Sequence, residues 1–220
     1  MVEVTLASSQ NILLDATIIT YGSASTAQIT KVISEEIETL WNEAHGEILI
    51  NRLPYNVIFR IVPQWRPDIM PEEVVGNTDP KNNYYRIEEY AFGNISFVDA
   101  IGSNSGYFKL ENLYVGSTTA AHEFGHGIGL EHPTQLDIRG RGRPGIMYPR
   151  GTWVDPQFQY DPAAQPGAPG GTMHPMHRRV NAQDIENLRL TRLRFRNNKA
   201  ILGDFTNVYH PDHREVEGIE

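Results

Sequence analysis

The chain has 220 residues, of which 40% are hydrophobic and 21% charged, which suits one globular domain with a sizeable core. Its formal net charge of −8 argues against non-specific binding to nucleic acids or anionic membranes, because both need a basic surface. The chain has no cysteine, which excludes disulfides and cysteine-ligated metal sites.

The hydropathy pattern gives no targeting or membrane signal. The first ten residues lack a basic stretch followed by an apolar one, so no signal peptide is expected in this chain. No apolar run approaches the roughly 20 residues that a membrane helix needs. We therefore expect neither a membrane nor a nucleic acid as partner.

The first sixty residues predict a strand, a helix and further strands. Residues 11–20 (NILLDATIIT) are β-branched and apolar and indicate a buried strand. Ser25 or Thr26 is then the expected N-cap of an amphipathic helix that Gly46 ends. The apolar positions of this helix recur at helical spacing: Ile29, Val32, Ile33, Ile37, Leu40 and Trp41. Strands follow at Ile48–Ile50 and Val57–Val62, separated by a turn around Pro54.

The middle of the chain predicts a loop and two short strands. Pro, Asp and Asn are frequent in residues 63–83, which is typical of a loop. Apolar residues alternate in Ala91–Ala100, which indicates a strand. A turn at Gly102–Gly106 separates this strand from a second one at Leu110–Val115.

Two helices and a long irregular segment complete the prediction. Thr118–Leu130 is expected to be helical, with Ser117 as its cap. Pro133–Gly171 is rich in Pro, Gly and Arg, and an irregular segment of this length in a compact domain is usually functional. A last helix opens at Asn181–Asp184 and carries Ile185, Leu188, Leu190 and Leu193. This order of elements favours an α+β fold, with the tail after Gly203 unassigned.

The segment from residue 121 to residue 133 (AHEFGHGIGLEHP) has the pattern of a zinc site. His122 and His126 are four residues apart, so on a helix they share one face with Cβ atoms about 5–6 Å apart. Two imidazoles at that spacing can bind one zinc ion at about 2.1 Å each. Glu123 lies beside the first histidine, where a base for a metal-activated water belongs.

The end of this segment supplies a third ligand. Gly129 allows the chain to leave the helix in a conformation that strains other residues, and His132 can then turn back towards the metal. Three protein ligands leave one position open, as in catalytic zinc sites. The alternative, solvated histidines on an ordinary helix, requires the five positions to coincide by chance, on the order of 1 in 10,000 for such a chain.

The pattern HExxHxxGxxH resembles the signature of the metzincin clan of zinc metalloendopeptidases. Gly145–Pro149 (GIMYP) is similar to the methionine turn of that clan, in its matrixin form, and makes Met147 the residue that supports the metal site from below. The segment from Val180 to Ile185 resembles the start of the C-terminal helix in matrixins and serralysins.

The resemblance implies a fold, a cofactor and a substrate. The fold would be a single two-lobed catalytic domain over residues 1–220, with lobes at about 1–130 and about 131–220, a mixed twisted sheet, an active-site helix and a C-terminal helix. One zinc ion would be held by His122, His126 and His132, with Glu123 as the catalytic base. The substrate would be a peptide or protein, the chain a monomer, and its location secreted or periplasmic.

The chain also departs from its named relatives. Pro149 stands where some of them have a tyrosine ligand, two residues after the methionine. Latency through a propeptide thiol is impossible without cysteine, and glycine-rich calcium repeats are absent. Aspartate-rich calcium loops are not evident, so calcium remains a possible but unsupported ligand.

Substrate binding in the clan uses an edge strand above the cleft. The segment Phe92–Asp99 is the candidate here, with an ordinary sheet strand as the alternative. The pocket wall that follows the methionine turn corresponds to Pro149–Trp153, which makes Tyr148 and Trp153 pocket candidates.

Other histidines and arginines carry weaker hypotheses. His174 and His177 are three residues apart and would need a third ligand to form a second metal site. His210 and His213 are expected in a solvated tail. The Arg139–Arg143 run (RGRGR) is expected to be a solvated loop near the cleft, or alternatively to favour acidic residues of the substrate.

The sequence thus favours an active zinc endopeptidase, and two alternatives stay open. The first is a binding module that keeps the fold without turnover, against which the intact ligands and Glu123 argue. The second is a zinc hydrolase that acts on other substrates, against which the methionine turn and the edge strand argue.

Overall fold

Strand β2 (Asn11–Tyr21) is the central strand of the fold. Its β-branched and apolar residues alternate between buried and half-buried positions over most of its length. On one edge it pairs in parallel with β4 (Leu53–Trp65) along most of its length. On the other edge it pairs antiparallel with β1 (Val2–Ala7) near its start and in parallel with β5 (Asn82–Glu88) near its end.

The remaining strands extend this sheet in both directions. The computed structural model describes residues 1–7 and 10–213 and places the strands in the order β3-β4-β2-β5-β7-β6. β3 (Glu47–Ile50) lies antiparallel to β4, and β8 (Lys199–Leu202) lies antiparallel to β1. β7 (Ser105–Lys109) runs parallel to β5, and β6 (Phe97–Val98) is antiparallel to β7. The chain therefore has an α+β fold with a mixed sheet, as the sequence predicts.

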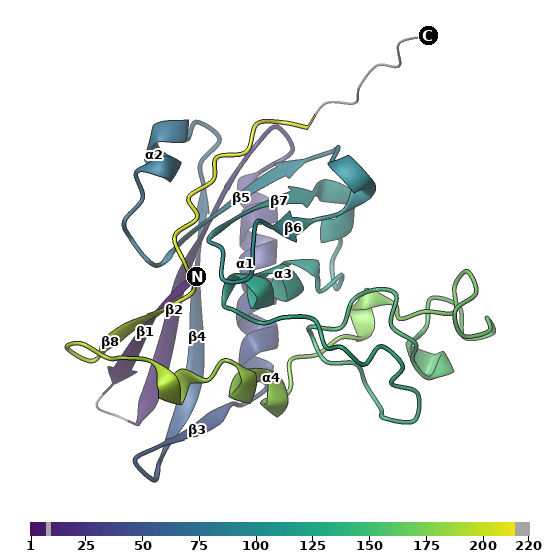
Figure 1. Cartoon of the computed structure of the whole chain (residues 1–220). Helices are drawn as coiled ribbons and strands as arrows, with labels where there is room; N and C mark the ends of the chain where they lie inside the picture. Colours follow the sequence, from purple (N-terminus) through teal and green to yellow (C-terminus); the bar gives the residue numbers. More distant parts are fainter. Residues whose placement is uncertain (8–9, 214–220) are drawn as a thin grey trace.

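Two helices cover one face of the sheet and enclose the main core (Figure 1). α1 (Ala27–Glu43) begins at the N-cap Thr26, whose hydroxyl accepts the amide N–H of Ile29 at 3.1 Å, and this confirms the predicted cap. α3 (Thr119–Gly127) packs against α1 and is wholly buried. The Trp41 indole N–H donates to the Ala121 carbonyl at 3.2 Å and so fixes α3 on α1.

Aromatic rings fill the space between these helices and the sheet. Trp41 lies with its ring centroid 5.2 Å from that of Phe59 on β4 and 6.1 Å from that of Phe124 on α3. All three side chains are at most 1% exposed. Aromatic contacts of this kind add to the burial of apolar area, so a cluster of buried rings holds the helix with the histidine motif.

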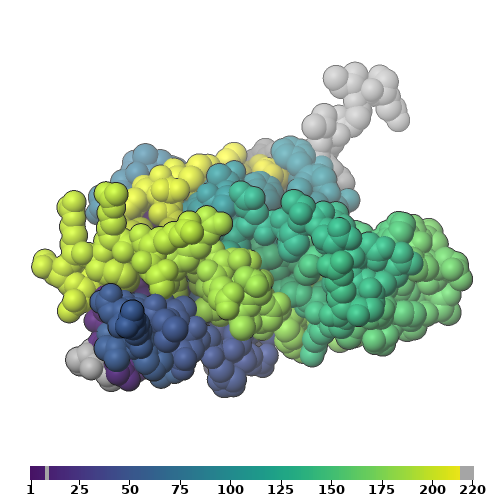
Figure 2. All heavy atoms as spheres, turned by 60° about the horizontal axis from the view of Figure 1, so that its bottom comes forward, coloured from purple at the N-terminus to yellow at the C-terminus, as the bar shows by residue number. Residues whose placement is uncertain are grey.

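The segment from residue 128 to residue 181 is nearly free of regular structure, as predicted for Pro133–Gly171. It contains two single-turn 3-10 helices, Pro156–Phe158 and Pro175–His177. Much of it gathers at one end of the molecule, where the teal and green atoms lie in Figure 2. Isolated bridges, among them Asp137 with Trp153 and Gln159 with Met173, hold the segment together.

The first predicted hairpin is displaced. The turn between β3 and β4 is formed by Asn51 and Arg52, with φ of 51° and 67°, and Pro54 lies inside β4 opposite Leu49. Two successive residues with positive φ give a turn whose twist matches the paired strands. The prediction of a turn around Pro54 is therefore wrong by two to three residues.

The prediction for the middle of the chain is wrong in several places. Residues 63–83 contain the end of β4, the short helix α2 (Pro71–Val75) and the start of β5. The strand predicted at Ala91–Ala100 is reduced to β6, because Gly93 with φ of 70° breaks the segment into a 3-10 turn, Phe92–Asn94. Leu110–Leu113 is also a 3-10 helix, and the strand lies earlier, at β7. β7 begins at Ser105 because it pairs with β5, so the strand takes up only the end of the turn predicted at residues 102–106.

Helix ends also differ from the prediction. The N-cap of α3 is Thr118 with φ of 57°, although the Ser117 hydroxyl accepts the Thr119 amide N–H at 3.2 Å. The last helix, α4 (Ala182–Asn187), starts at Asn181 as predicted but is short, because Arg189 with φ of 52° ends the helical course. Strands β1, β5 and β8 were not predicted, and α1 ends at Glu43, ahead of Gly46.

The described part of the C-terminal segment, up to residue 213, lies against the sheet, so the prediction of a solvated tail for His210 and His213 is wrong. His210 Nε2 lies 2.8 Å from Asp99 Oδ1, and the His213 ring stacks on Tyr107 with centroids 3.8 Å apart. Asn104 holds the same segment by accepting the Thr206 and Asn207 amide N–H groups at 2.9 Å each. None of the helices among the described residues is long and apolar enough to cross a membrane.

We expect Trp41→Phe to lower the free energy of unfolding by about 1–3 kcal/mol, because it removes a buried hydrogen bond and leaves a cavity under α3. Trp153→Phe is the matched control, since Trp153 is 40% exposed and should change stability by less than about 1 kcal/mol. Urea denaturation of both variants measures the difference. Equal effects would show that Trp41 does not anchor α3.

Candidate metal centre

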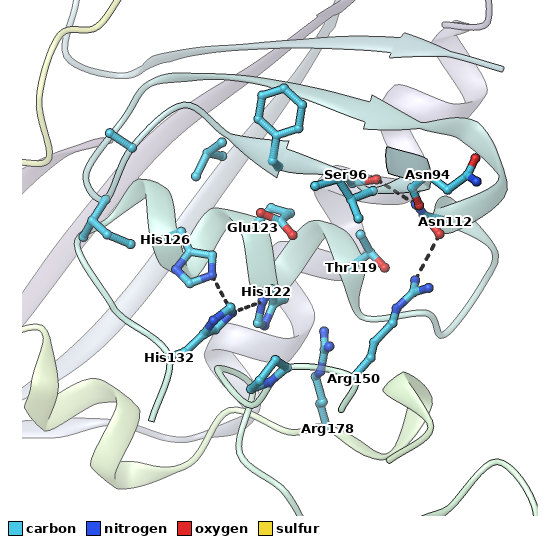
Figure 3. A pocket seen from close by; sticks show the side chains of 16 residues that line it. Asn94, Ser96, Asn112, Thr119, His122, Glu123, His126, His132, Arg150 and Arg178 are labelled. Carbon is cyan, nitrogen blue, oxygen red and sulfur yellow. Dashed lines mark hydrogen bonds between the residues drawn. The ribbon is translucent and has the colours of Figure 1, made fainter. Parts of the chain in front are cut away.

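Three histidines converge at the floor of a cleft (Figure 3). His122 and His126 lie on one face of α3, and His132 comes from the segment that follows the helix. His132 Nε2 lies 3.1 Å from His122 Nε2 and 3.0 Å from His126 Nε2. Within residues 1–7 and 10–213 this is the one group of three metal-ligating side chains, and it could hold a metal ion.

Backbone carbonyls set the orientation of two of the rings. His122 Nδ1 lies 2.7 Å from the Ile146 carbonyl oxygen, and His126 Nδ1 lies 2.7 Å from the Leu130 carbonyl oxygen. Each Nδ1 must therefore donate its proton, which leaves the Nε2 lone pair facing the centre of the cluster. A neutral His132 carries at most one proton on Nε2, so it can donate a hydrogen bond to only one of the two facing lone pairs. A bound cation would attract the lone pairs of all three imidazoles and is therefore more favourable at the centre than the imidazoles alone.

The surroundings keep these imidazoles neutral. Burial lowers the pKa of His122 well below its usual value, and burial also lowers the pKa of His126 and of His132. The Arg178 cation acts in the same direction on all three. Neutral imidazole is the form that binds a metal, so at neutral pH the three histidines are in the protonation state that metal binding requires.

Gly129 makes the turn between the helix and the third histidine. Its φ of +97° is the left-handed conformation predicted for it, and a Cβ there would meet no atom within 4 Å. Glycine is therefore favoured at this position because of the backbone conformation, and not because a side chain would have no room. The turn is closed by the Leu130 amide N–H, which donates to the Gly125 carbonyl at 3.0 Å, and it brings the Leu130 carbonyl to His126.

Met147 packs directly beneath the helix of the two histidines. A Cβ at Gly125 would overlap Met147 Sδ and come within 3.2 Å of the Trp41 indole. Met147 is 3% exposed, and the preceding residue, Ile146, supplies the carbonyl that orients His122. The turn at 145–149 thus supports the cluster both by packing and by a hydrogen bond.

Glu123 projects into the cleft beside the cluster (Figure 3). Burial raises the pKa of its carboxyl to about 8, which the Arg178 and Arg150 cations and the Val98 amide N–H oppose. A divalent ion held by the neighbouring histidines would also oppose this rise and lower the pKa of Glu123, because its charge favours the carboxylate. Near neutral pH the group can then both accept and release a proton.

The cleft has a volume of about 590 Å³ and runs between the sheet edge and the irregular segment. Its upper wall is β6 with its flanking residues, and its lower wall contains Pro149, Arg150 and Arg178. β6 is the last strand of the sheet, and no described strand pairs with its outer edge. An extended chain could add to this edge above the three histidines.

Not all predicted pocket residues line the cleft. Pro149 does, but Trp153 packs against Gly167 and lies under the Arg139 guanidinium, and Tyr148 packs on a small separate core. The predicted edge strand Phe92–Asp99 contributes Phe97 and Val98 as strand, whereas Phe92 does not line the cleft.

The weaker hypotheses have different outcomes. The Arg139–Arg143 run is exposed throughout, as predicted for a solvated loop, and none of its residues lines the cleft. Arg139 pairs with Asp137 and Arg143 donates to the His177 carbonyl, so binding of acidic substrate residues by the run stays unsupported. His174 and His177 have ring centroids 6.0 Å apart, and no third ligand joins them in the part of the chain that the structure describes.

Several residues of the cleft carried no signal in the sequence. Thr119, Asn112, Arg150 and Arg178 line it, yet each is an ordinary residue of a turn, loop or helix start. No protein-family profile and no curated protein matches this chain. The assignment of the site therefore rests on its own geometry.

We expect Gly125→Ala to destabilise the protein by about 1–3 kcal/mol and to weaken any metal binding by the three histidines at least ~10-fold, because the new methyl group displaces Met147. A glycine-to-alanine change in a helix is otherwise stabilising, by up to about 1 kcal/mol, so the sign of the effect is informative. Denaturation and competitive zinc titration measure both quantities. Gly151→Ala is the control, since a Cβ there meets nothing within 4 Å; stabilisation by Gly125→Ala would disprove the packing role.

The lowered pKa of His122 predicts how stability depends on pH in the metal-free protein. The unfolded chain takes up a proton near pH 6.5 that the folded chain takes up only at lower pH, so stability is fully present above pH 6.5 and is lost below it. His122→Gln removes this contribution. We expect the variant to lose less stability than the wild type between pH 7 and pH 5 in thermal unfolding, whereas exposed His45→Gln keeps the wild-type slope.

Proposed function

We propose that this chain is a zinc-dependent endopeptidase of the metzincin type, with Glu123 as its catalytic base. The observation that carries the proposal is the convergence of His122, His126 and His132 beside a buried glutamate, in a cleft bordered by a sheet edge with which no described strand pairs. Each of these features also occurs singly in proteins of other classes. Together they are the parts that metal-assisted peptide hydrolysis requires.

The donor set fits zinc. Three neutral imidazoles are borderline ligands of the kind zinc prefers, and two nitrogens bound to a tetrahedral zinc at 2.0–2.1 Å would lie about 3.3 Å apart. The two Nε2 distances to His132, 3.0 and 3.1 Å, are close to this value. The carbonyls that fix the rings of His122 and His126 are the second ligand shell usual for such histidines.

Glu123 performs the proton transfers in this mechanism. When bound, zinc supplies Lewis acidity, which activates a water molecule and polarises the carbonyl group to be attacked. The Glu123 carboxylate accepts the proton of that water as the oxygen attacks, and its carboxylic acid then gives the proton to the leaving amine. The raised pKa of Glu123 suits a group that must hold this proton between the two steps.

The shape of the cleft favours a peptide over other substrates. The edge of β6 offers backbone donors and acceptors to an extended chain, and side chains of such a chain alternate towards and away from the floor. An ester or phosphate substrate would leave this edge unused. Residues on both sides of the metal centre line the cleft, which suits cleavage within a chain.

The test is zinc content and casein cleavage by the wild type and by Glu123→Ala in parallel. We expect one zinc per chain in both proteins, with cleavage lowered at least ~100-fold in the variant and abolished by a chelator in the wild type. Glu131→Ala is the matched control, because Glu131 lies in the same segment but is exposed.

Other outcomes separate the alternatives. Zinc in both proteins without cleavage of casein, but with hydrolysis of small esters, would favour a hydrolase of another class. Zinc without any hydrolysis would favour a binding module. A wild type that takes up no zinc on reconstitution would contradict the proposal as a whole.

A further inference from the structure

The cleft continues past the three histidines to a basic wall. Arg178 and Arg150 extend into this part of the cleft from the side opposite Ser96 and Asn94 (Figure 3). Arg178 is only 3% exposed, whereas Arg150 is exposed. Thr119, at the first turn of α3, completes the wall and is 4% exposed.

No group bonds directly to the charge of Arg178. Its guanidinium makes no hydrogen bond and no ion pair with the described residues, and its Nε is buried without a partner. The Glu123 and Glu36 carboxyls interact with this charge only at longer range. Burial lowers the pKa of Arg178 to about 10, so the group is still a cation at neutral pH. A buried charge without a hydrogen-bonded counter-ion is unfavourable, and such a group in a cleft indicates a missing ligand.

A second unpaired group lies on the same wall. The Thr119 hydroxyl is also buried and has no hydrogen-bond partner. A guanidinium contains only hydrogen-bond donors, and a hydroxyl can donate one hydrogen bond. A ligand that offers hydrogen-bond acceptors would therefore satisfy both groups. Glu123 does not fill this role, because it forms no ion pair with Arg178 although its charge raises the pKa of Arg178.

Hydrogen bonds of the backbone fix the position of Arg178 in this wall. The Arg178 amide N–H donates to the Pro175 carbonyl at 3.0 Å, and that carbonyl also accepts the Thr118 hydroxyl at 2.9 Å. Arg179 pairs with the start of the methionine turn through a bond to the Pro144 carbonyl at 3.1 Å. The position of Arg178 is therefore fixed from α3 and from the turn below the metal centre.

Arg150 is held in place by a polar residue of the opposite wall. Its Nη2 donates to Asn112 Oδ1 at 3.1 Å, and Asn112 Nδ2 donates in turn to the Ser96 hydroxyl at 3.3 Å. This arrangement leaves other donors of the Arg150 guanidinium free for a ligand. Two guanidinium groups and a hydroxyl thus surround one end of the cleft.

We propose that Arg178, with Arg150 and the Thr119 hydroxyl, binds a carboxylate of the substrate next to the scissile bond. This inference rests on the proposed peptidase function and names a preference of the same site. The carboxylate belongs either to an aspartate or glutamate side chain or to the C-terminus of a peptide. Arginine suits this task, because its planar fork matches the two oxygens of a carboxylate.

Selectivity follows from the burial of Arg178. A glutamine in place of glutamate has nearly the same shape but no charge, so Arg178 would remain without a counter-ion. A site built around a polar partner rejects an analogue that lacks it far more strongly than an apolar pocket rejects a smaller side chain. We expect a preference for glutamate over glutamine of at least ~10-fold in kcat/KM.

The experiment uses zinc-loaded protein and quenched fluorescent peptides that differ in one residue beside the scissile bond. Glu, Gln and Leu are compared on each side of the bond, with cleavage sites verified by mass spectrometry. A second set ends at that residue with a free carboxylate or an amide. Preference for Glu in the first set identifies a side-chain carboxylate, and preference for the free terminus in the second identifies an α-carboxylate.

Arg178→Met tests the assignment of the residue. We expect the ratio of kcat/KM for the Glu and Gln peptides to fall towards 1, while Arg141→Met, an exposed arginine outside the cleft, keeps the wild-type ratio. Arg150→Gln should lower this ratio less than Arg178→Met. Because Arg150 is exposed, this variant still tests the site if Arg178→Met fails to fold. An equal loss for all peptides with an altered pH profile would show that Arg178 acts on Glu123, which would overturn the proposal.

A binding measurement separates failure of this inference from failure of the proposed function. Zinc-loaded Glu123→Gln is titrated with the same Glu and Gln peptides by calorimetry, so no turnover is needed. Tighter binding of the Glu peptide that is lost in Glu123→Gln/Arg178→Met supports the carboxylate site even if casein is not cleaved. Cleavage of peptides with equal rates for Glu, Gln and Leu would refute the carboxylate site and leave the peptidase intact.

Discussion

His132 Nε2 lies within hydrogen-bonding distance of two other imidazole nitrogens, those of His122 and His126, and this close approach governs how the surrounding segments are arranged. Lone pairs at 3.0 and 3.1 Å repel unless a proton or a cation lies between them. The fold resists this repulsion with two carbonyls, of Ile146 and Leu130, which hold the rings of His122 and His126. A cluster whose repulsion a cation relieves is well suited to binding a metal.

The same turn links the metal centre to the basic wall of the cleft. Ile146 and Met147 support α3 from below, and the start of this turn, at Pro144, pairs with Arg179. Arg178 is therefore positioned by the element that positions His122. Zinc binding and recognition of a substrate carboxylate would thus depend on one short segment, which couples the two proposed properties of the site.

The division of the fold into a regular and an irregular part has a physical basis. The sheet, α1 and α3 bury the large apolar side chains and carry most of the core. The segment from residue 128 to residue 181 contributes five residues to this core and forms a small cluster of its own around Ile138, Val154 and Met173, but it contains no long strand or helix. It is ordered instead by turns and isolated bridges, and so it can shape a cleft wall without the regular spacing of a strand or helix.

Local patterns in the sequence were enough to predict the features that local geometry controls: the spacing that brings His122 and His126 to one helix face, the left-handed Gly129, the cap at Thr26 and the turn at Met147. The register of β5 to β7, the short course of α4 and the acceptors behind the histidines arise from tertiary contacts. Tertiary contacts also explain why Arg150 and Arg178 line the cleft and the Arg139–Arg143 run does not. These features depend on contacts between residues far apart in the chain, and no local pattern encodes which distant segment will supply a partner or bury a charge.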